Sequence, residues 1–164
     1  MENIRATGYL RQSDAGAELT FERKFDAPIA DVWANVTESA RTEGWIGVWE
    51  GDPRVGGTVT FTMTAEASAE PEQVTILECD PPHRLQAEFT SEAGTWHLQL
   101  DLQEIDGVTT LTFAQLVDQG DDVTRIGPGW DYYLDRLVAS RGGLPMPTWD
   151  EYYPELIGHY AELG

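Results

Sequence analysis

Hydrophobic and polar residues alternate along most of the middle of the chain, and a period of two predicts β-strands. The clearest alternation lies in residues 56–67, GGTVTFTMTAEA, where Val59, Phe61 and Met63 are separated by threonines. Four further segments also predict strands: EQVTILECD, HRLQAEFT, GTWHLQLDLQE and VTTLTFAQLV. The sequences between them, DPP, SEAG and DG, are turn-forming, so we expect antiparallel hairpins.

The N-terminal region adds another hairpin. The segment GYLRQSDAGAELTFERKF predicts a strand, a turn at residues 13–16 and a second strand. In the strand GTWHLQLDLQE, apolar residues fall on one face: Trp96, Leu98, Leu100 and Leu102. Polar residues fall on the other: His97, Gln99 and Asp101. One dry face and one wet face are typical of an antiparallel sheet that is covered on one side.

A period of 3.6 residues predicts helices before and after these strands. Pro28 suits a first helical position, and a buried stripe follows it: Ile29, Val32, Trp33 and Val36. The segment TESARTEGW predicts a second short helix. A longer stripe comes late in the chain and ends at the glycine pair 142–143: Trp130, Tyr133, Leu134, Leu137 and Val138. Its start stays open, because GPG at residues 127–129 should break or kink a helix.

Together these elements predict an α+β fold. We expect a curved antiparallel sheet of about six to seven strands, two short helices and a long C-terminal helix. The concave face of such a sheet is too wide for its own side chains to fill, and the long helix is the element left to cover it. We expect one domain over residues 1–164, with a core at about 18–142 and a C-terminal helical extension, PTWDEYYPELIGHYAEL, in 143–164.

Charge and cysteine content narrow the functional classes. The net charge is −19, from 29 acidic and 10 basic side chains, which argues against binding to nucleic acid or anionic membranes. Cys79 is the single cysteine, so no intrachain disulfide forms and a reducing compartment fits. The N-terminus lacks an apolar signal region, and no apolar run approaches the roughly 20 residues of a membrane span. We therefore expect a cytoplasmic protein.

Several segments in this order resemble one protein superfamily. They are FERKFDAPIADVW, the tryptophan of EGWIG, VGGTVTF, ILECDPPHRLQAEF, TTLTFAQLV and GWDYYLDRL, which together cover about residues 18–142. This pattern resembles the SRPBCC or START-like superfamily with its helix-grip fold, and within it the AHSA-type domain, named after the activator of a heat-shock chaperone ATPase. The chain departs from the pattern at Gln115, where a histidine is common, and at Pro128, where the last helix usually runs on.

The resemblance implies a cavity between sheet and long helix that holds a small apolar or amphipathic molecule. The superfamily includes lipid and hormone carriers, polyketide aromatase/cyclases and chaperone cofactors, so the fold leaves the function open.

In-facing strand positions, the long helical stripe and two early indoles supply the candidate ligand-binding residues. They are Trp45, Trp49, Phe61, Met63, Phe89, Trp96, Leu98, Phe113, Gln115, Trp130, Tyr133, Leu134 and Leu137. We assign Trp33 to the core beneath the first helix, and Trp45 and Trp49 to the mouth of the pocket. Tyr133, Gln115 and the indole N–H groups are the polar groups expected to orient a ligand.

Motifs for catalysis or metal binding are missing from the sequence. The three histidines are far apart, and HExxH, CxxC and GxSxG do not occur. Cys79 adjoins Asp80, which raises the pKa of a thiol, so a buried apolar role is favoured. We expect no catalytic residue, no metal and no cofactor. Arg125 and Arg136 are candidates for holding an anionic ligand at the cavity mouth, although surface ion pairs are the favoured reading.

Three functions fit these observations. The leading one is a binding protein for a small hydrophobic molecule, aromatic or similar to a lipid or polyketide. The alternatives are a cyclase or hydratase-like enzyme in the same cavity and a chaperone-cofactor-like interaction domain. A homodimer and a chaperone partner both stay open.

Overall fold

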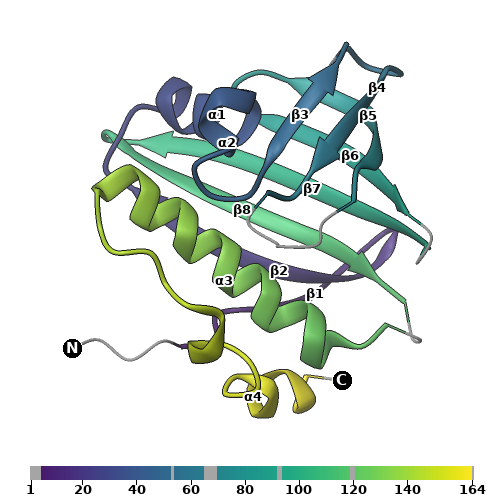
Figure 1. The fold of residues 1–164 in the computed structure, drawn as a ribbon, viewed down its shortest axis with the longest axis vertical. Helices are drawn as coiled ribbons and strands as arrows, with labels where there is room; N and C mark the ends of the chain where they lie inside the picture. Colours follow the sequence, from purple (N-terminus) through teal and green to yellow (C-terminus); the bar gives the residue numbers. More distant parts are fainter. Residues whose placement is uncertain (1–4, 53, 65–69, 92–93, 119–120, 164) are drawn as a thin grey trace.

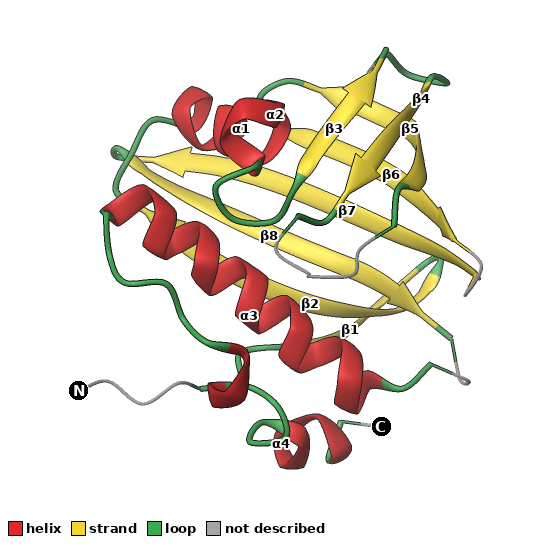
Figure 2. Cartoon of the chain, viewed as in Figure 1, coloured by secondary structure: helices red, strands yellow, loops and turns green. Residues whose placement is uncertain are grey.

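One antiparallel sheet forms the centre of the molecule (Figures 1 and 2). The computed structural model describes residues 5–52, 54–64, 70–91, 94–118 and 121–163. Within these residues the sheet has eight strands in the order β1-β2-β8-β7-β6-β5-β4-β3. The strands are β1 Tyr9–Ser13, β2 Gly16–Phe25, β3 Val48–Gly51, β4 Thr58–Thr62, β5 Glu72–Asp80, β6 Arg84–Ser91, β7 Gly94–Ile105 and β8 Val108–Val117.

The helices lie on one face of this sheet. They are α1 Ile29–Thr37, α2 Ser39–Thr42, α3 Val123–Gly142, the short 3₁₀ helix η1 Trp149–Glu151 and α4 Ile157–Ala161. α3 runs along β8 and β2, while α1 and α2 lie beyond its C-terminal end (Figure 1). The predicted α+β architecture, with two short helices and a long C-terminal helix, is confirmed. None of the described helices is long and apolar enough to cross a membrane.

The sheet differs from the prediction at one edge. β3 was not predicted, because its four residues VWEG carry no alternation. It pairs with β4 and brings Trp49 opposite Phe61. The predicted strand over residues 56–67 is shorter in the structure, since β4 ends at Thr62, and residues 65–67 of that prediction lie outside the described residues. In the predicted turn SEAG, residues 92–93 also lie outside them.

α3 starts earlier than its glycines and proline suggested. It begins at Val123, where the side chain of Asp122 accepts a hydrogen bond from the Thr124 amide, and it continues through Pro128 without a break. Gly127 and Pro128 are buried, and Gly127 packs against the ring of Tyr160. This packing offsets the one backbone hydrogen bond that a proline removes from a helix. The expectation of a helix break at residues 127–129 was therefore wrong.

The C-terminal extension is less helical than expected. In the part of the extension that the structure describes, only η1 and α4 are helical; they are joined by turns, and α4 begins at Ile157. The extension is nevertheless anchored in the core, because Tyr152 and Tyr160 are both fully buried.

A buried polar network fixes α3 over β2. Arg23 of β2 forms ion pairs with Asp131 at 3.0 Å and with Asp135 at 3.1 Å, and the Asp131 side chain is 0% exposed. Thr7 donates to Asp131 through its hydroxyl at 2.5 Å and through its amide. The Tyr160 hydroxyl also donates to Asp131. We call these five residues the clamp.

Two phenols, Tyr160 of the clamp and Tyr152 next to it, have pKa values well above the ordinary range. Burial is the main cause for both Tyr152 and Tyr160, and the neighbouring carboxylates add to it. Tyr152 donates to Asp135 at 2.8 Å. Burial likewise raises the pKa of Asp135, although Arg23 opposes the shift. Both phenols therefore stay protonated as donors, which is what the two carboxylates require to be satisfied.

The clamp decides where space is left. It holds one side of α3 against β2 and α4, so the opposite side faces the concave surface of β4 to β8. At its C-terminal end, Arg141 pairs with Asp31 of α1 at 2.9 Å. α3 is thus attached along one side and at one end, and a hollow remains between its free side and the sheet.

Candidate ligand-binding site

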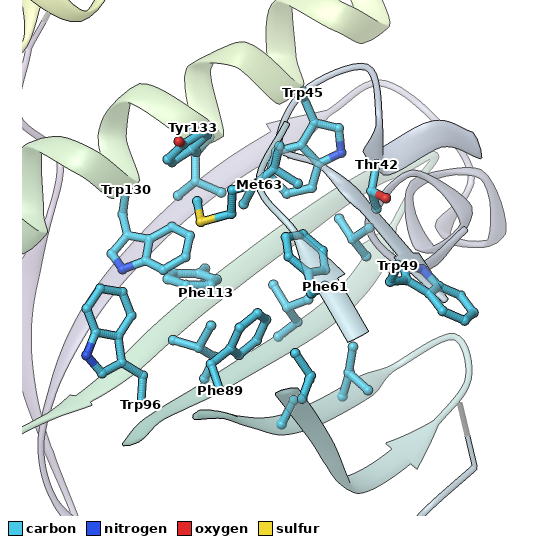
Figure 3. Close-up of a pocket in the computed structure, with 18 of the residues that line it drawn as sticks. Thr42, Trp45, Trp49, Phe61, Met63, Phe89, Trp96, Phe113, Trp130 and Tyr133 are labelled. Carbon is cyan, nitrogen blue, oxygen red and sulfur yellow. The ribbon is translucent and has the colours of Figure 1, made fainter. Parts of the chain in front are cut away.

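The hollow under α3 is a cavity of about 1020 Å³. Its walls come from the concave side of β4 to β8, from α3, and from the segment that connects α1 to β3 (Figure 3). The chain has six tryptophans, and all of them line this cavity: Trp33, Trp45, Trp49, Trp96, Trp130 and Trp149. Concave, mostly apolar spaces of roughly 300–1,000 Å³ are typical of small-molecule sites.

Most of the sequence-predicted pocket residues lie on this wall. They are Trp45, Trp49, Phe61, Met63, Phe89, Trp96, Leu98, Phe113, Trp130, Tyr133 and Leu134. The strand residues reach it because alternate positions of each strand point to the concave face. Register aligns them across the sheet, with Phe89 opposite Trp96 and Leu100 opposite Phe113. Whether these residues bind a ligand stays a prediction.

Gln115 and Leu137 do not line the cavity, which corrects two of the predicted positions. Leu137 is 0% exposed and packs in the core under α3. Gln115 is 1% exposed, and its side-chain oxygen accepts a hydrogen bond of 2.6 Å from the Trp130 indole. Both point inward, as the periodicity indicated, but they lie behind the wall. Gln115 therefore orients Trp130 and is not available to orient a ligand.

The indole N–H groups also differ from expectation. Trp45 donates to the main-chain oxygen of Asn35 at 2.9 Å, and Trp49 donates to that of Thr37 at 2.8 Å. Because Trp130 also donates to Gln115, the N–H groups of all three indoles are hydrogen-bonded within the protein. What they offer the cavity is apolar ring surface.

Aromatic contacts build the floor and the α3 side of the hollow (Figure 3). The ring centroids of Phe113 and Trp130 lie 4.4 Å apart, and Trp96 meets Trp130 at 6.5 Å in an edge-on arrangement. Phe61 and Phe89 form a T-shaped pair at 5.6 Å. Trp96 is 41% exposed, although its strand position placed it on the dry face. An exposed indole on this wall indicates that the cavity opens to solvent beside it.

Two tryptophans of the wall were not predicted as ligand-binding residues. Trp33 was assigned to the core; it is half-buried, and the hollow lies on its inner side. Helical periodicity shows which side of α1 points inward but not whether that side is filled. Trp149 comes from the C-terminal extension, where it meets Tyr132 edge-on at 5.4 Å and stacks on Tyr153 at 5.6 Å.

Charged and polar groups occur at separate places on the wall. Glu38 and Glu72 line it, as do Arg125 and Cys79. Burial, helped by Asp80, raises the pKa of the Cys79 thiol, which makes it a poor nucleophile, as expected. Arg136 is not on the wall. It donates to the main-chain oxygen of Trp45 at 2.9 Å.

The histidines lie away from the cavity. His97 pairs with Glu88 at 3.2 Å on the outer face of the sheet, and His159 contacts the main-chain oxygen of Gly8 at 2.8 Å. His83 lies near the main-chain oxygen of Leu102, at 3.5 Å. Across the described residues, no group of three histidine, cysteine or carboxylate side chains could hold a metal ion.

Comparison with protein families gives one match. The family model described as Activator of Hsp90 ATPase homolog 1-like protein matches residues 26–140. These residues contain α1 to β8 and most of α3, so the match includes nearly the whole cavity wall. None of the curated protein sequences matches the chain.

Solved structures give closer views of the fold. The crystal structure of CalU16 from Micromonospora echinospora is similar at 26% identity and a TM-score of 0.77, over 96% of this chain and 95% of CalU16. The solution structure of a protein encoded by gene BPP1335 from Bordetella parapertussis is similar at 17% identity and a TM-score of 0.74. The similarity covers 98% of this chain and 92% of that protein. DynU16, a protein in the dynemicin biosynthetic locus, is similar at 18% identity and a TM-score of 0.66, over 80% of this chain and 49% of DynU16. The last two likenesses show the fold alone.

Proposed function

The chain belongs to the family of Activator of Hsp90 ATPase homolog 1-like proteins, and from this premise we propose that it binds a small, hydrophobic, ring-containing molecule in the cavity under α3. One observation carries the proposal: all six tryptophans line a single hollow of about 1020 Å³. Tryptophan is the largest side chain, and a core built only for stability would interdigitate such rings and fill the space.

The chemistry of the wall supports a ring-containing ligand. Aromatic faces attract other rings in offset or edge-on geometries, each pair contributing about 0.5–1.5 kcal/mol beyond area burial. Because the indole N–H groups of Trp45, Trp49 and Trp130 are bonded to the protein, a guest meets few polar groups that it must satisfy. DynU16 has this fold and belongs to a biosynthetic locus, which is in keeping with a small-molecule ligand.

The test uses N-phenyl-1-naphthylamine, a neutral probe that fluoresces in apolar surroundings. We expect one-to-one binding that quenches tryptophan fluorescence, measured by titration and by calorimetry. In the variant Ala87→Trp an indole is added from the middle of the concave wall, because Ala87 lines the cavity. We expect it to lower the affinity at least tenfold, since the new ring occupies the guest's space.

Thr90→Trp is the matched control. It adds the same ring to the same strand, but Thr90 is exposed and its side chain lies on the opposite face from Ala87 and Phe89. Circular dichroism verifies that both variants fold. If the two variants weaken probe binding equally, or if the unmodified protein binds no probe, the cavity is not the binding site.

An enzymatic role is a second candidate, favoured by the carboxylates on the wall. Glu38 and Glu72 line the same hollow, and carboxylates are common general acids and bases. A cyclase or hydratase-like reaction would then act on the bound molecule. Chemical conversion of a bound ligand that is lost in Glu72→Gln but kept in Ala87→Gly would favour this candidate over simple binding.

A chaperone-cofactor role is a third candidate, favoured by the family's name. It would use the outer surface, where the net charge of −19 would favour a basic partner. Stimulation of a purified Hsp90 ATPase that persists in raised salt would support it, because purely electrostatic attraction is screened under those conditions. For all three candidates we propose a cytosolic setting, which suits a chain with a single cysteine.

A further inference from the structure

Arg125 places a positive charge at the edge of the cavity. It is the third residue of α3, its side chain is exposed, and it is one of the residues that line the hollow. It thus differs from Arg136, which hydrogen-bonds to the protein outside the wall. Of the described residues that line the wall, Arg125 is the one with a cationic side chain, and the others are apolar, polar or acidic.

Most other arginines of the chain have carboxylate partners. Arg11 pairs with Glu18, Arg23 with Asp131 and Asp135, Arg41 with Asp31, Arg54 with Asp52, Arg84 with Glu78 and Asp101, and Arg141 with Asp31. Among the described residues, no carboxylate lies within 4.0 Å of the Arg125 guanidinium. The sequence had favoured a surface ion pair for this residue. In a chain with 29 acidic side chains, a cation left without one is available to an outside anion.

The acidic residues nearest in the chain are already engaged. Asp122 accepts hydrogen bonds from the amide and hydroxyl of Thr124. Asp121 accepts one from the Asp118 amide at 2.7 Å. Both carboxylates thus have hydrogen-bond partners of their own, and neither forms an ion pair with Arg125. The N-terminal end of a helix also carries a partial positive charge, which favours an anion beside Arg125.

The position of Arg125 relative to the rings suits an amphipathic guest. Trp130 is five positions further along α3, a rise of about 7.5 Å along the helix axis. Trp130 contacts both Trp96 and Phe113. An anionic group held at Arg125 would therefore leave an attached ring system within reach of these three rings.

The wall carboxylates come from other elements than Arg125. Glu72 pairs in register with Phe61, which is opposite Trp49, and Glu38 follows the Thr37 carbonyl that binds the Trp49 indole. Figure 3 shows Trp49 and Thr42 across the cavity from Trp96 and Trp130. An anion held at Arg125 would thus lie on the α3 side of the hollow, whereas Glu38 belongs to the junction of α1 and α2 and Glu72 to the start of β5.

From these observations we infer that the ligand is an aromatic molecule with one anionic group, and that Arg125 binds this group at the cavity mouth. This inference rests on the proposed function and narrows its ligand class. A guanidinium binds carboxylate or sulfonate oxygens through paired N–H donors, and this sets the orientation in which the rings enter.

The test compares two probes with the same ring skeleton. 8-Anilinonaphthalene-1-sulfonate carries a sulfonate, and N-phenyl-1-naphthylamine lacks it. In Arg125→Gln we expect the affinity for the sulfonate probe to fall about fivefold to tenfold while the neutral probe binds within twofold of the unmodified protein. Arg125→Lys keeps the charge, and we expect it to recover most of the sulfonate affinity.

Arg54→Gln is the control for net charge. It removes one exposed arginine that is absent from the wall, so we expect both affinities to change less than twofold. The inference is overturned if Arg125→Gln leaves sulfonate binding unchanged, if it weakens both probes equally, or if Arg54→Gln has the same effect. Failure of the neutral probe to bind the unmodified protein would overturn the proposed function itself, which separates the two results.

Discussion

The two sides of α3 differ in packing: one is closely packed against β2 and α4, and the other faces the cavity. On one side, Asp131 and Asp135 bind Arg23, and Gly127 lets Tyr160 approach closely, so this side is held by close packing and ion pairs. On the other side, Trp130 and Tyr133 face a hollow of about 1020 Å³. One helix therefore carries a close-packed polar contact and an unfilled apolar wall within a single turn.

This difference indicates how the chain keeps a cavity open. An unfilled hollow forfeits packing energy, because rings along its wall lack partner atoms on one side. The clamp compensates by fixing α3 to β2 and α4 through buried, charge-assisted hydrogen bonds. We therefore expect substitutions on the clamp side to change stability and substitutions on the cavity side to change binding.

The largest expected effect is on the clamp. Asp131→Asn removes a fully buried charge that pairs with Arg23, so we expect the free energy of unfolding to fall by about 3 kcal/mol. Denaturant unfolding measures this change, and titration with N-phenyl-1-naphthylamine measures the affinity of the folded fraction. Asp150→Asn, on an exposed carboxylate, is the control and should change stability by less than about 0.5 kcal/mol. A loss of probe affinity with no loss of stability would break the comparison.

A smaller effect is expected from a pair of glycines two residues apart. A Cβ at Gly127 would lie 2.4 Å from the Tyr160 ring, whereas a Cβ at Gly129 would meet nothing within 4 Å. Gly127→Ala should displace α4 and lower the unfolding free energy by about 1–3 kcal/mol. Gly129→Ala should raise it by up to about 1 kcal/mol through helix propensity. Thermal unfolding distinguishes the two, and equal effects of either sign would show that α4 does not depend on Gly127.

The smallest effect concerns an exposed ion pair, which sharpens the contrast with the buried one. Hydrogen bonds from Arg141 and then from Arg41 lower the pKa of Asp31. The stability from this pair is present above the ordinary pKa of an aspartate and disappears as the pH falls through the lowered value. Because Asp31 is 41% exposed, Asp31→Asn should cost less than about 1 kcal/mol at pH 7. Unfolding across a pH series checks this, and a difference that grows as the pH falls would contradict it.

Much of the fold could be predicted because periodicity is a local property. The alternation in β5 to β8 and the stripe on α3 specify strands, faces and helix from neighbouring residues alone. β3 was not predicted, because four residues are too few to show a period. The start of α3 could not be predicted because this turn of the helix is packed through Gly127 against Tyr160, which lies far along the chain.

The site could be predicted only in part for a related reason. Strand alternation predicts that Gln115 points inward and helical periodicity predicts the same for Trp33, yet neither pattern distinguishes a filled interior from a hollow one. Whether a residue lies on the wall or behind it depends on long-range contacts, such as the bond from Trp130 to Gln115. The clamp was also out of reach, since Arg23 and Asp131 are 108 positions apart.

The most direct test of the two-sided helix follows both sides in one titration. In an amide and indole nuclear magnetic resonance spectrum, each tryptophan N–H gives its own signal, and the Thr7 and Gly8 amides report on the clamp side. On adding N-phenyl-1-naphthylamine we expect ring-current shifts at the indole signals of Trp96 and Trp130 and unchanged signals for Thr7 and Gly8. Two results would contradict this account: indole signals that do not shift at saturating probe, or shifts at the Thr7 and Gly8 amides as large as those at the indoles.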